Sequence, residues 1–446
     1  MKIPVSPPPQ SELIEQTPDD MKKVLLYRTS PAPDGKYLHW EKLRHLPPPE
    51  GLSNKQWWLA IKLSRLNSSR EIPLADSAGL LFSYCLPDPL LEEVHSIDSR
   101  AKGRVATTED VINEESRDRF LISSLIEEAI TSSQLEGAAT TRQVAAQMLR
   151  ESRKPRDKSE QMILNNFQAM QEIVKLKHEP MSIDLLLHLH SSLTQDTLDD
   201  SSAAGRFQMP NEERVRVVDH GTGTTLHAPP PAEQIPERME QLVTFANATN
   251  KAGGFLHPIV KSIILHFWLA YVHPFFDGNG RVARALFYWS AARSGYWLLE
   301  YISISRVLKA APARYARSFL YTETDENDLT YFLLDQAIVI NRAIDSLERH
   351  LKLKSEQVKR VAEVIRDNRA LNHRQVALLS HAIRHPGHRY TIRSHQTSHR
   401  VAYATARKDL LELAELELLN ERPVDKKTFG FVVPHDIEER VNRLAD

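Results

Sequence analysis

The sequence lacks the cysteine that a disulfide framework needs. Cys85 is the one cysteine among 446 residues and stands in the apolar run LLFSYCLPDPLL. No internal disulfide can form, and a buried structural thiol is the expected role. An excess of charge of one sign is lacking too, since the formal net charge is -1. Global charge therefore predicts no partner, and a nucleic-acid surface would have to be a local patch.

Long apolar runs are also missing. No stretch approaches the roughly 18 consecutive apolar residues that cross a bilayer. The N-terminus, MKIPVSPPPQSELIEQ, has no apolar signal core. We therefore expect a cytoplasmic protein with no membrane association.

The apolar residues that are present follow a helical pattern. From about Gln56 onward they recur every three to four positions, as in WWLAIKLSRL, SEQMILNNFQAMQEIVKL and IVKSIILHFWLAYVHPF. Strand signals are scarce. The β-branched residues near Val215, Val217 and Val218, followed by DHGTGTTLHAPPP, predict one short hairpin. The sequence thus predicts a mainly α fold.

The length allows two or three domains, and the composition divides them. Ten of the 26 prolines fall in the first 50 residues, which predicts extended chain there. We expect a proline-rich extension over 1–55, a helical region over 56–200, a catalytic core over 201–345, and a linker helix with a C-terminal module over 346–446. In that module, two helices precede the segment RPVDKKTFGFVVP, which is the order of a winged helix-turn-helix.

The most informative segment is HPFFDGNGRVAR, residues 273–284, between two helical runs. Gly278 and Gly280 allow a tight turn, so the backbone N–H groups of residues 278–280, Asn279 included, can face an anion at the start of the next helix. Arg281 and Arg284 are three residues apart and share a face of that helix. Two guanidinium groups at a helix N-terminus suit two phosphate groups.

Two further side chains in this segment suit chemistry on a nucleotide. Asp277 is a hard oxygen ligand for Mg²⁺, which usually takes one or two carboxylates together with phosphate oxygens. His273 stands just before the turn, where it can remove a proton from an attacking hydroxyl. The set lacks a covalent nucleophile and a Walker lysine. It therefore predicts in-line attack on a phosphorus of Mg-ATP.

These residues resemble the signature of the Fic family, His-x-Phe-x-Asp/Glu-Gly-Asn-Gly-Arg-x-x-Arg, at every defined position. The segments LHLHSSL, AGRF and LHAPPPAEQIPERMEQL are also similar to the family, and the resemblance covers about residues 85–345. It implies a Fic-type helical bundle with a small hairpin flap at 215–228. It also implies a protein adenylyltransferase, which moves AMP from ATP onto Ser, Thr or Tyr hydroxyls of a target protein or of itself.

The resemblance also implies a role for each position. His273 is the general base, and Asp277 holds Mg²⁺ on the α- and β-phosphates. Asn279, with the backbone of its two neighbouring glycines, forms the anion hole. Arg281 binds the β-phosphate and Arg284 the γ-phosphate. Tyr301 and Tyr315 are candidates for adenine contacts, with a core role as the alternative for each, and a homodimer is common among relatives.

The segment SSQLEG, residues 132–137, ends an amphipathic helix with Gly137 as a plausible cap. Ser132 and Glu136 are four residues apart and share a face. Beside the signature, this segment resembles the family's inhibitory motif, which implies that Glu136 pairs with Arg284 and misplaces the phosphates of ATP. Some members of the family also use this glutamate to remove AMP, so net AMP removal stays open.

The C-terminal module is basic. Residues 369–410 hold eight Arg or Lys residues and one acid. DNA binding by a winged helix is one reading, and docking of another protein is the alternative. A transcription regulator whose Fic domain senses nucleotide is the competing hypothesis for the whole chain.

Overall fold

The computed structural model describes residues 2–15, 21–102, 114–219, 221, 223–248, 254–368, 370–384, 388–423, 429–434 and 436–443. They fall into two compact units. The first comprises Met1–Gly103 with Ser123–Ile344, and the second comprises Arg104–Ile122 with Asp345–Asp446. The four-part division expected from the composition stays a prediction.

The N-terminal region contains more helix than its prolines suggest. Short helices form between the proline clusters, namely α1 (Gln10–Glu15), α2 (Met21–Leu26) and α3 (Trp40–Leu43). They pack on α4 (Asn54–Ser68) through a cluster that includes Leu13, Val24 and Trp58. A hairpin of β1 (Arg70–Ala75) and β2 (Leu81–Tyr84) follows, with Arg70 opposite Tyr84. This hairpin was not predicted, because REIPLA and LFSY are too short to show a strand period.

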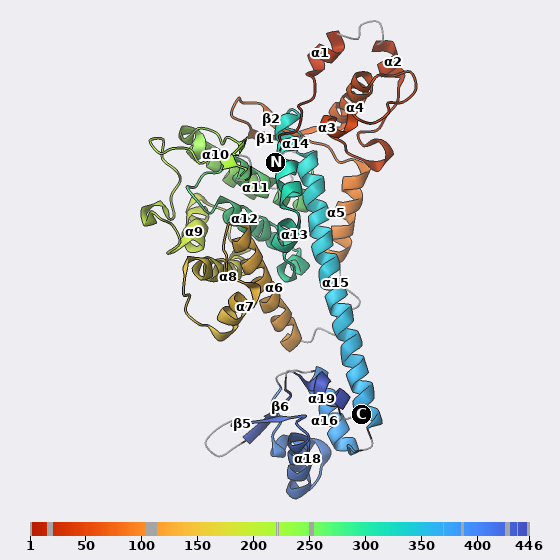
Figure 1. Ribbon diagram of the computed structural model, residues 1–446, viewed down its shortest axis with the longest axis vertical. Coiled ribbons are helices and arrows are strands. Elements are labelled where there is room, and N and C mark those ends of the chain that lie inside the picture. The colour runs from red at the N-terminus through yellow and green to blue at the C-terminus, as the bar shows by residue number, and fades with distance from the viewer. Residues whose placement is uncertain are drawn as a thin grey trace. The chain divides into compact units, whose positions relative to one another are not determined.

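The rest of the first unit is mainly helical, and one of its helices begins in residues 114–122, which group with the second unit. Its helices are α5 (Asp88–Ala101), α6 (Glu114–Leu135), α7 (Arg142–Glu151), α8 (Lys158–Leu176), α9 (Ile183–Thr194), α10 (Ile235–Asn247), α11 (Pro258–Val272), α12 (Asn279–Arg293), α13 (Ile304–Ala310) and α14 (Pro312–Thr324). The central pair, α11 and α12, lies side by side (Figure 1). Both helices are buried on nearly every face, because the other helices surround them. The two helices therefore fix both ends of the turn between them, while Phe276 and Asp277 in the turn stay exposed.

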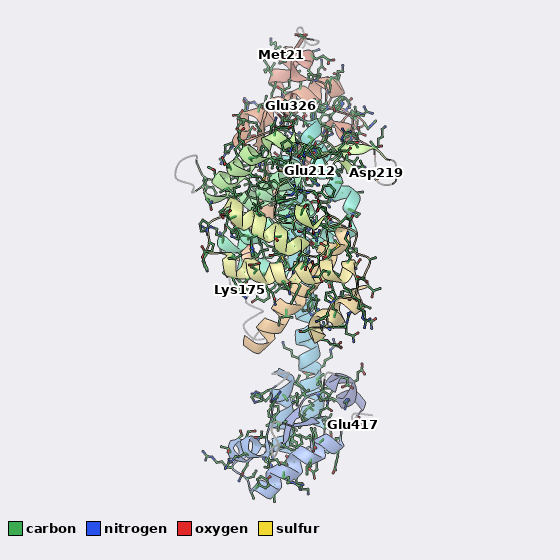
Figure 2. The ribbon with its side chains drawn as sticks, turned by 90° about the vertical axis from the view of Figure 1, so that its left-hand side faces the viewer. Met21, Lys175, Glu212, Asp219, Glu326 and Glu417 are labelled. Atoms are coloured by element: carbon green, nitrogen blue, oxygen red, sulfur yellow. The ribbon has the colours of Figure 1, made fainter. Side chains whose placement is uncertain are left out.

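The predicted hairpin near 215–228 is present. Strands β3 (Val217–Val218) and β4 (Thr225–His227) pair antiparallel, with Val217 opposite His227. Figure 2 shows Asp219, just after β3, at the margin of the helical body. We call residues 215–228 the flap.

Helix α15 (Thr330–Asp367) supplies residues to both units. The elements of the second unit that come after it in the chain are α16 (His373–Arg384), α17 (Ile392–His399), α18 (Tyr403–Glu415), β5 (Asn420–Pro423), β6 (Phe429–Val432) and α19 (Ile437–Arg443). Helix α17 was not predicted, since IRSHQTSH has no apolar period. Local hydrogen bonds begin it, because Thr391 and Ser394 form a capping box. The assignment of this unit as a winged helix stays a prediction.

Among the residues that the structure describes, no helix is both long and apolar enough to cross a membrane.

Candidate active site

The turn between α11 and α12 begins and ends with left-handed backbone. His273 ends α11 with a φ of 52°, and Gly278 precedes α12 with a φ of 85°. A Cβ on Gly278 would lie 2.8 Å from Thr194 Cγ2 on α9. Two features therefore require glycine at position 278, namely its left-handed backbone conformation and its close approach to α9.

Asn279 shapes this turn with its side chain. Its Oδ1 accepts from the Phe275 N–H at 2.9 Å, and its Nδ2 donates to the Phe275 carbonyl at 2.8 Å. The side chain is buried, so the amide group is used within the turn. The backbone N–H at the start of α12 is then the part of Asn279 that can face an anion.

Phe275 is in turn held by His190 of α9. The two rings stack at 3.8 Å between centroids. His190 Nε2 donates to the Asp277 carbonyl at 2.9 Å, and Nδ1 accepts from the Gly205 N–H at 3.0 Å. Burial lowers the pKa of His190 to about 4, so the ring stays neutral and keeps this one tautomer at neutral pH. His190 thus joins α9, the 204–207 segment and the turn.

Arg281 is a buried cation with unsatisfied donors. Its Nη1 donates to the Leu193 carbonyl at 2.7 Å, and its Nη2 lies 3.6 Å from Asp277 Oδ2. Its Nε and Nη2 have no hydrogen-bond partner among the described residues. Burial lowers its pKa. A buried guanidinium left this way is costly without an anionic partner, and a phosphate would satisfy both nitrogens.

Asp277 lies at the mouth of the same turn, with its side chain 49% exposed. Its Oδ1 accepts from the Gly278 N–H at 2.5 Å. No cluster of three or more metal-ligating side chains occurs in the described part of the chain. One accessible carboxylate beside a phosphate cradle nevertheless fits Mg²⁺ that arrives as Mg-ATP, since phosphate oxygens and water supply most of its ligands.

His273 presents one nitrogen to the site. Its Nδ1 lies 3.2 Å from the Ala270 carbonyl, and a carbonyl can only accept, so Nδ1 carries the proton. Burial lowers the pKa of His273 to about 4. The ring is therefore neutral near pH 7, and its Nε2 is free to accept a proton.

Arg284 is paired within the chain. Its Nε donates to Ser132 Oγ at 2.9 Å, and its Nη2 donates to the Ser132 carbonyl at 3.1 Å and to Glu136 Oε1 at 2.7 Å. Burial opposes both charges, but the attraction between them wins. It holds the pKa of Arg284 above its usual value and the pKa of Glu136 below its own.

The carboxylate of Glu136 also lies on the first turn of α12. A Cβ on Gly280 would be 2.2 Å from Glu136 Oε1. Gly137 follows with a φ of 94°, which ends the helical path after α6. The negative charge of Glu136 therefore stands at the positive end of α12, where a phosphate would also be attracted.

The carbonyl end of α11 is capped by two side chains from the base of the flap. Arg214 donates to the carbonyls of Val272 at 2.7 Å and of His273 at 3.0 Å. His227 Nε2 lies 2.7 Å from the Tyr271 carbonyl, and its Nδ1 lies 2.7 Å from Glu323 Oε2 on α14. The guanidinium of Arg214 is favourable at the negative end of a helix. Arg214 thus fixes the backbone of His273, and His227 ties the last turn of α11 to the flap.

A cavity of about 210 Å³ opens beside these groups. The α12 side of its lining includes His273, Gly280 and Arg284, together with Glu136. The rest of the lining is largely apolar, from the flap and α14, and includes Val217, Leu226, Tyr315, Ala316 and Phe319. Tyr315 thus lines the cavity. Tyr301 is not among its lining residues and is buried against Trp297.

The structure therefore gathers the site residues named from the sequence, apart from Tyr301, around one turn and one cavity. It adds His190, Arg214 and His227, which hold the turn through backbone carbonyls and were not predicted. The segments LHLHSS and LHAPPP contain two of them, but a histidine that contacts a carbonyl leaves no pattern in a single sequence.

Comparison with known proteins finds a family match over part of the chain. Residues 180–291 match the family model described as Fic/DOC family. The chain is similar to protein adenylyltransferase fic-1 of Caenorhabditis elegans, with 32% identity over 124 residues. These residues are 28% of this chain and 22% of that protein. It is 31% identical over 120 residues to protein adenylyltransferase Fic of Nematostella vectensis, 27% of this chain and 25% of that protein. The chain thus spans about a quarter of the length of these relatives.

The fold is similar to that of a solved structure. A crystal structure of a Fic family protein from Desulfovibrio desulfuricans G20 matches with a TM-score of 0.50 at 19% identity, over 78% of this chain and 97% of that chain. The expected family resemblance and the mainly α, Fic-type fold are confirmed.

Proposed function

We propose, from the premise that residues 180–291 of this chain are a Fic domain, that the protein transfers AMP from Mg-ATP to hydroxyl side chains of proteins. One observation carries the proposal. The neutral His273, the unsatisfied donors of buried Arg281 and the first turn of α12 meet at one turn beside a cavity. A base, a phosphate-binding cation and a helix N-terminus are the parts that this reaction needs.

In the proposed step, the target hydroxyl oxygen attacks the α-phosphorus of ATP. The hydroxyl proton passes to His273 Nε2, the bond from the α-phosphorus to the bridging oxygen breaks, and pyrophosphate leaves. Arg281 and the N–H groups that begin α12 stabilise the charge on the phosphate oxygens. Bound Mg²⁺, held by Asp277, would supply further charge neutralisation. The target is left with AMP on its Ser, Thr or Tyr oxygen.

The apolar part of the cavity suits the nucleotide base. Tyr315, Phe319 and Leu226 offer apolar surface for a flat ring. Tyr315 is therefore the stronger of the two tyrosine candidates for adenine contact. The flap, next to this pocket, would register the target by adding a strand to β3 and β4.

Glu136 is proposed as a built-in brake. Its carboxylate occupies donors of Arg284 and lies against Gly280, so a γ-phosphate cannot take the same place. ATP that binds beside it would be displaced, and a misplacement of about 1 Å costs on the order of a hundredfold in rate. The same carboxylate could activate water for AMP removal, which makes net removal the second activity to test.

The competing hypothesis is a regulator that only senses nucleotide. The His273 geometry argues against it, because a sensor has no need of a neutral imidazole with a free Nε2 beside the phosphate cradle. The target protein, modification of the chain itself and a homodimer are further parts of the proposal.

The test uses ATP labelled at either the α- or the γ-phosphate, with the Glu136→Gly variant and a cell lysate. We expect protein label from the α position alone and a mass increase of one AMP on Ser, Thr or Tyr. His273→Ala should lose labelling by a factor of about 10² to 10⁴. Label from the γ position, or full labelling by His273→Ala, would contradict the proposal. Release of AMP from premodified protein by the unsubstituted chain, lost in Glu136→Gly, would support removal.

A further inference from the structure

The second unit contains a surface that the proposed reaction does not use. Residues 391–408, which cover α17, the following turn and the start of α18, contain four Arg or Lys residues and no Asp or Glu. Because 58 of the 446 residues are acidic, an average stretch of 18 would hold about two. The four cations are Arg393, Arg400, Arg407 and Lys408, and all are exposed. We call these residues the basic face.

The cations of the basic face are poorly neutralised. Within the described part of the chain, Arg393, Arg400 and Arg407 form no ion pair, and Lys408 lies 3.6 Å from Glu412 at the surface. An exposed pair at that distance contributes little. The next acid, Asp409, is buried and points inward, where Arg374 donates to it at 2.7 Å and His395 lies at 3.1 Å. The exposed charge of the basic face, residues 391–408, is therefore positive, and the acids Glu412 and Glu415 follow only in the later turns of α18.

The basic face is also shaped for close approach to a polyanion. Arg400 ends α17 in the left-handed region with a φ of 52°, and α18 begins three residues later. Ala402 provides no side-chain cap for α18, and both Ala402 and Ala404 are exposed. No side chain of Ala402 therefore competes for the N–H groups that begin α18, which lets a phosphate approach them.

A protein partner is less well matched to this surface. Interface cores are usually apolar, with aromatic anchors and few charges. Within residues 391–408, Tyr403 is the one large apolar side chain that is strongly exposed, at 55%. It lies one helical turn before Arg407, so the two share a face of α18. Arginine can hydrogen-bond to guanine in the major groove, and an aromatic ring can make apolar contact with a thymine methyl group.

We propose that α17 and α18 bind double-stranded DNA, with the first turns of α18 in the major groove. Tyr403 and Arg407 face the bases, while Arg393, Arg400 and Lys408 contact phosphates. Three phosphate contacts give a slope of about -2.7 for log K against log salt, which is a loss of about 40-fold between 50 and 200 mM salt.

The experiment measures fluorescence anisotropy of a labelled random-sequence 30-bp duplex with the full chain, at 50 to 200 mM salt. We expect Arg407→Glu to weaken binding at least tenfold and Arg400→Ala to reduce the salt slope by about one. Lys359→Glu is the matched control, since Lys359 is exposed on α15 in the same unit, and it should bind within about twofold of the unsubstituted chain. Circular dichroism verifies that each variant folds.

Three outcomes would overturn the proposal. The first is no binding of the duplex at 50 mM salt. The second is equal binding by Arg407→Glu and Lys359→Glu. The third is binding of a labelled acidic peptide as tight as that of the duplex, which would identify the basic face as a docking site for acidic proteins.

Discussion

Two arginines three residues apart on α12 are in opposite electrostatic situations. Arg281 is buried with two nitrogens that lack a hydrogen-bond partner in the described residues, with Asp277 3.6 Å from one of them. Arg284 is buried with donors satisfied by Ser132 and Glu136. One cation is prepared for a ligand, and the other already holds a carboxylate of its own chain. In the proposed phosphate site, we therefore infer that Arg281 is available to a ligand, whereas Arg284 is available only when Glu136 leaves it.

The largest expected effect comes from removing either cation in the Glu136→Gly background. Arg281→Met and Arg284→Met should each lower AMP transfer by about 10² to 10³, because each removes a charged donor from the phosphates. Initial rates with α-labelled ATP measure this loss. If Arg281→Met kept full activity, its unsatisfied nitrogens would have no role in binding phosphate.

The same substitutions in the otherwise unchanged chain should separate the two arginines by stability. Arg284→Met leaves Glu136 without its partner, which we expect to cost about 2 kcal/mol, since the side chain of Glu136 keeps 26% exposure to water. Arg281→Met removes a cation with few partners and should cost less. Thermal unfolding measures the loss of stability in each variant. Equal losses would mean that the two arginines do not differ in their contribution to stability.

Removing the carboxylate should make the two arginines alike. Glu136→Gly is expected to raise AMP transfer about a hundredfold, and Glu136→Gln less, because the amide still hydrogen-bonds Arg284 without a charge. Glu127→Gln is the control, since Glu127 lies on the same helix and pairs with exposed Arg142. Transfer that is equally fast with and without the Glu136 carboxylate would remove the brake from the proposal.

A smaller effect is expected at the cap of α11. Arg214→Met loses the hydrogen bonds to the carbonyls of Val272 and His273. We expect kcat to fall about tenfold with little change in the KM for ATP, because the base is misplaced but the arginines of α12 are not. Arg214→Lys should restore part of kcat, since it keeps a cation at the helix end. A rise in KM alone would place Arg214 in nucleotide binding.

The smallest effect concerns pH. Burial lowers the pKa of His273 to about 4, so the neutral form dominates well below the usual histidine range. For Glu136→Gly, kcat/KM should therefore change by less than about twofold between pH 8 and pH 6. A steep decline centred near pH 6.5 would show a solvated imidazole instead.

The depressed pKa of Glu136 has its own pH signature in stability. A carboxylate whose pKa is lower in the folded than in the unfolded state stabilises the fold at pH values above its ordinary pKa, here 4.5. This contribution is lost as the pH falls through the pKa of the folded state. The difference in melting temperature between the unsubstituted chain and Glu136→Gln should be largest at neutral pH and shrink below about pH 4.5. A constant difference would mean that the pair does not titrate.

Much of the site could be predicted, and the missing parts share a cause. The spacing from His273 to Arg284 predicted the turn and its two guanidinium groups, because residues within one helix turn must be neighbours. The hydrogen bonds of Asn279 to the backbone of Phe275, and the cap of α11 by Arg214, join groups with no sequence period. The β1–β2 hairpin and α17 were missed for a related reason, since short elements with polar or mixed composition depend on caps and neighbours.

The order of residues by itself predicted a helical protein with a glycine-containing turn between two helices, a short hairpin and a basic C-terminal segment. Periodicity, glycine positions and local spacing act over a few residues, so one chain suffices to read them. The resemblance to the Fic family already implied the pair of Glu136 with Arg284. Only the tertiary structure decided that Glu136 lies against Gly280, that Arg281 keeps unsatisfied donors, and that partial burial keeps His273 neutral. Those properties depend on burial and on contacts between segments more than a hundred residues apart in some cases, and packing alone establishes them.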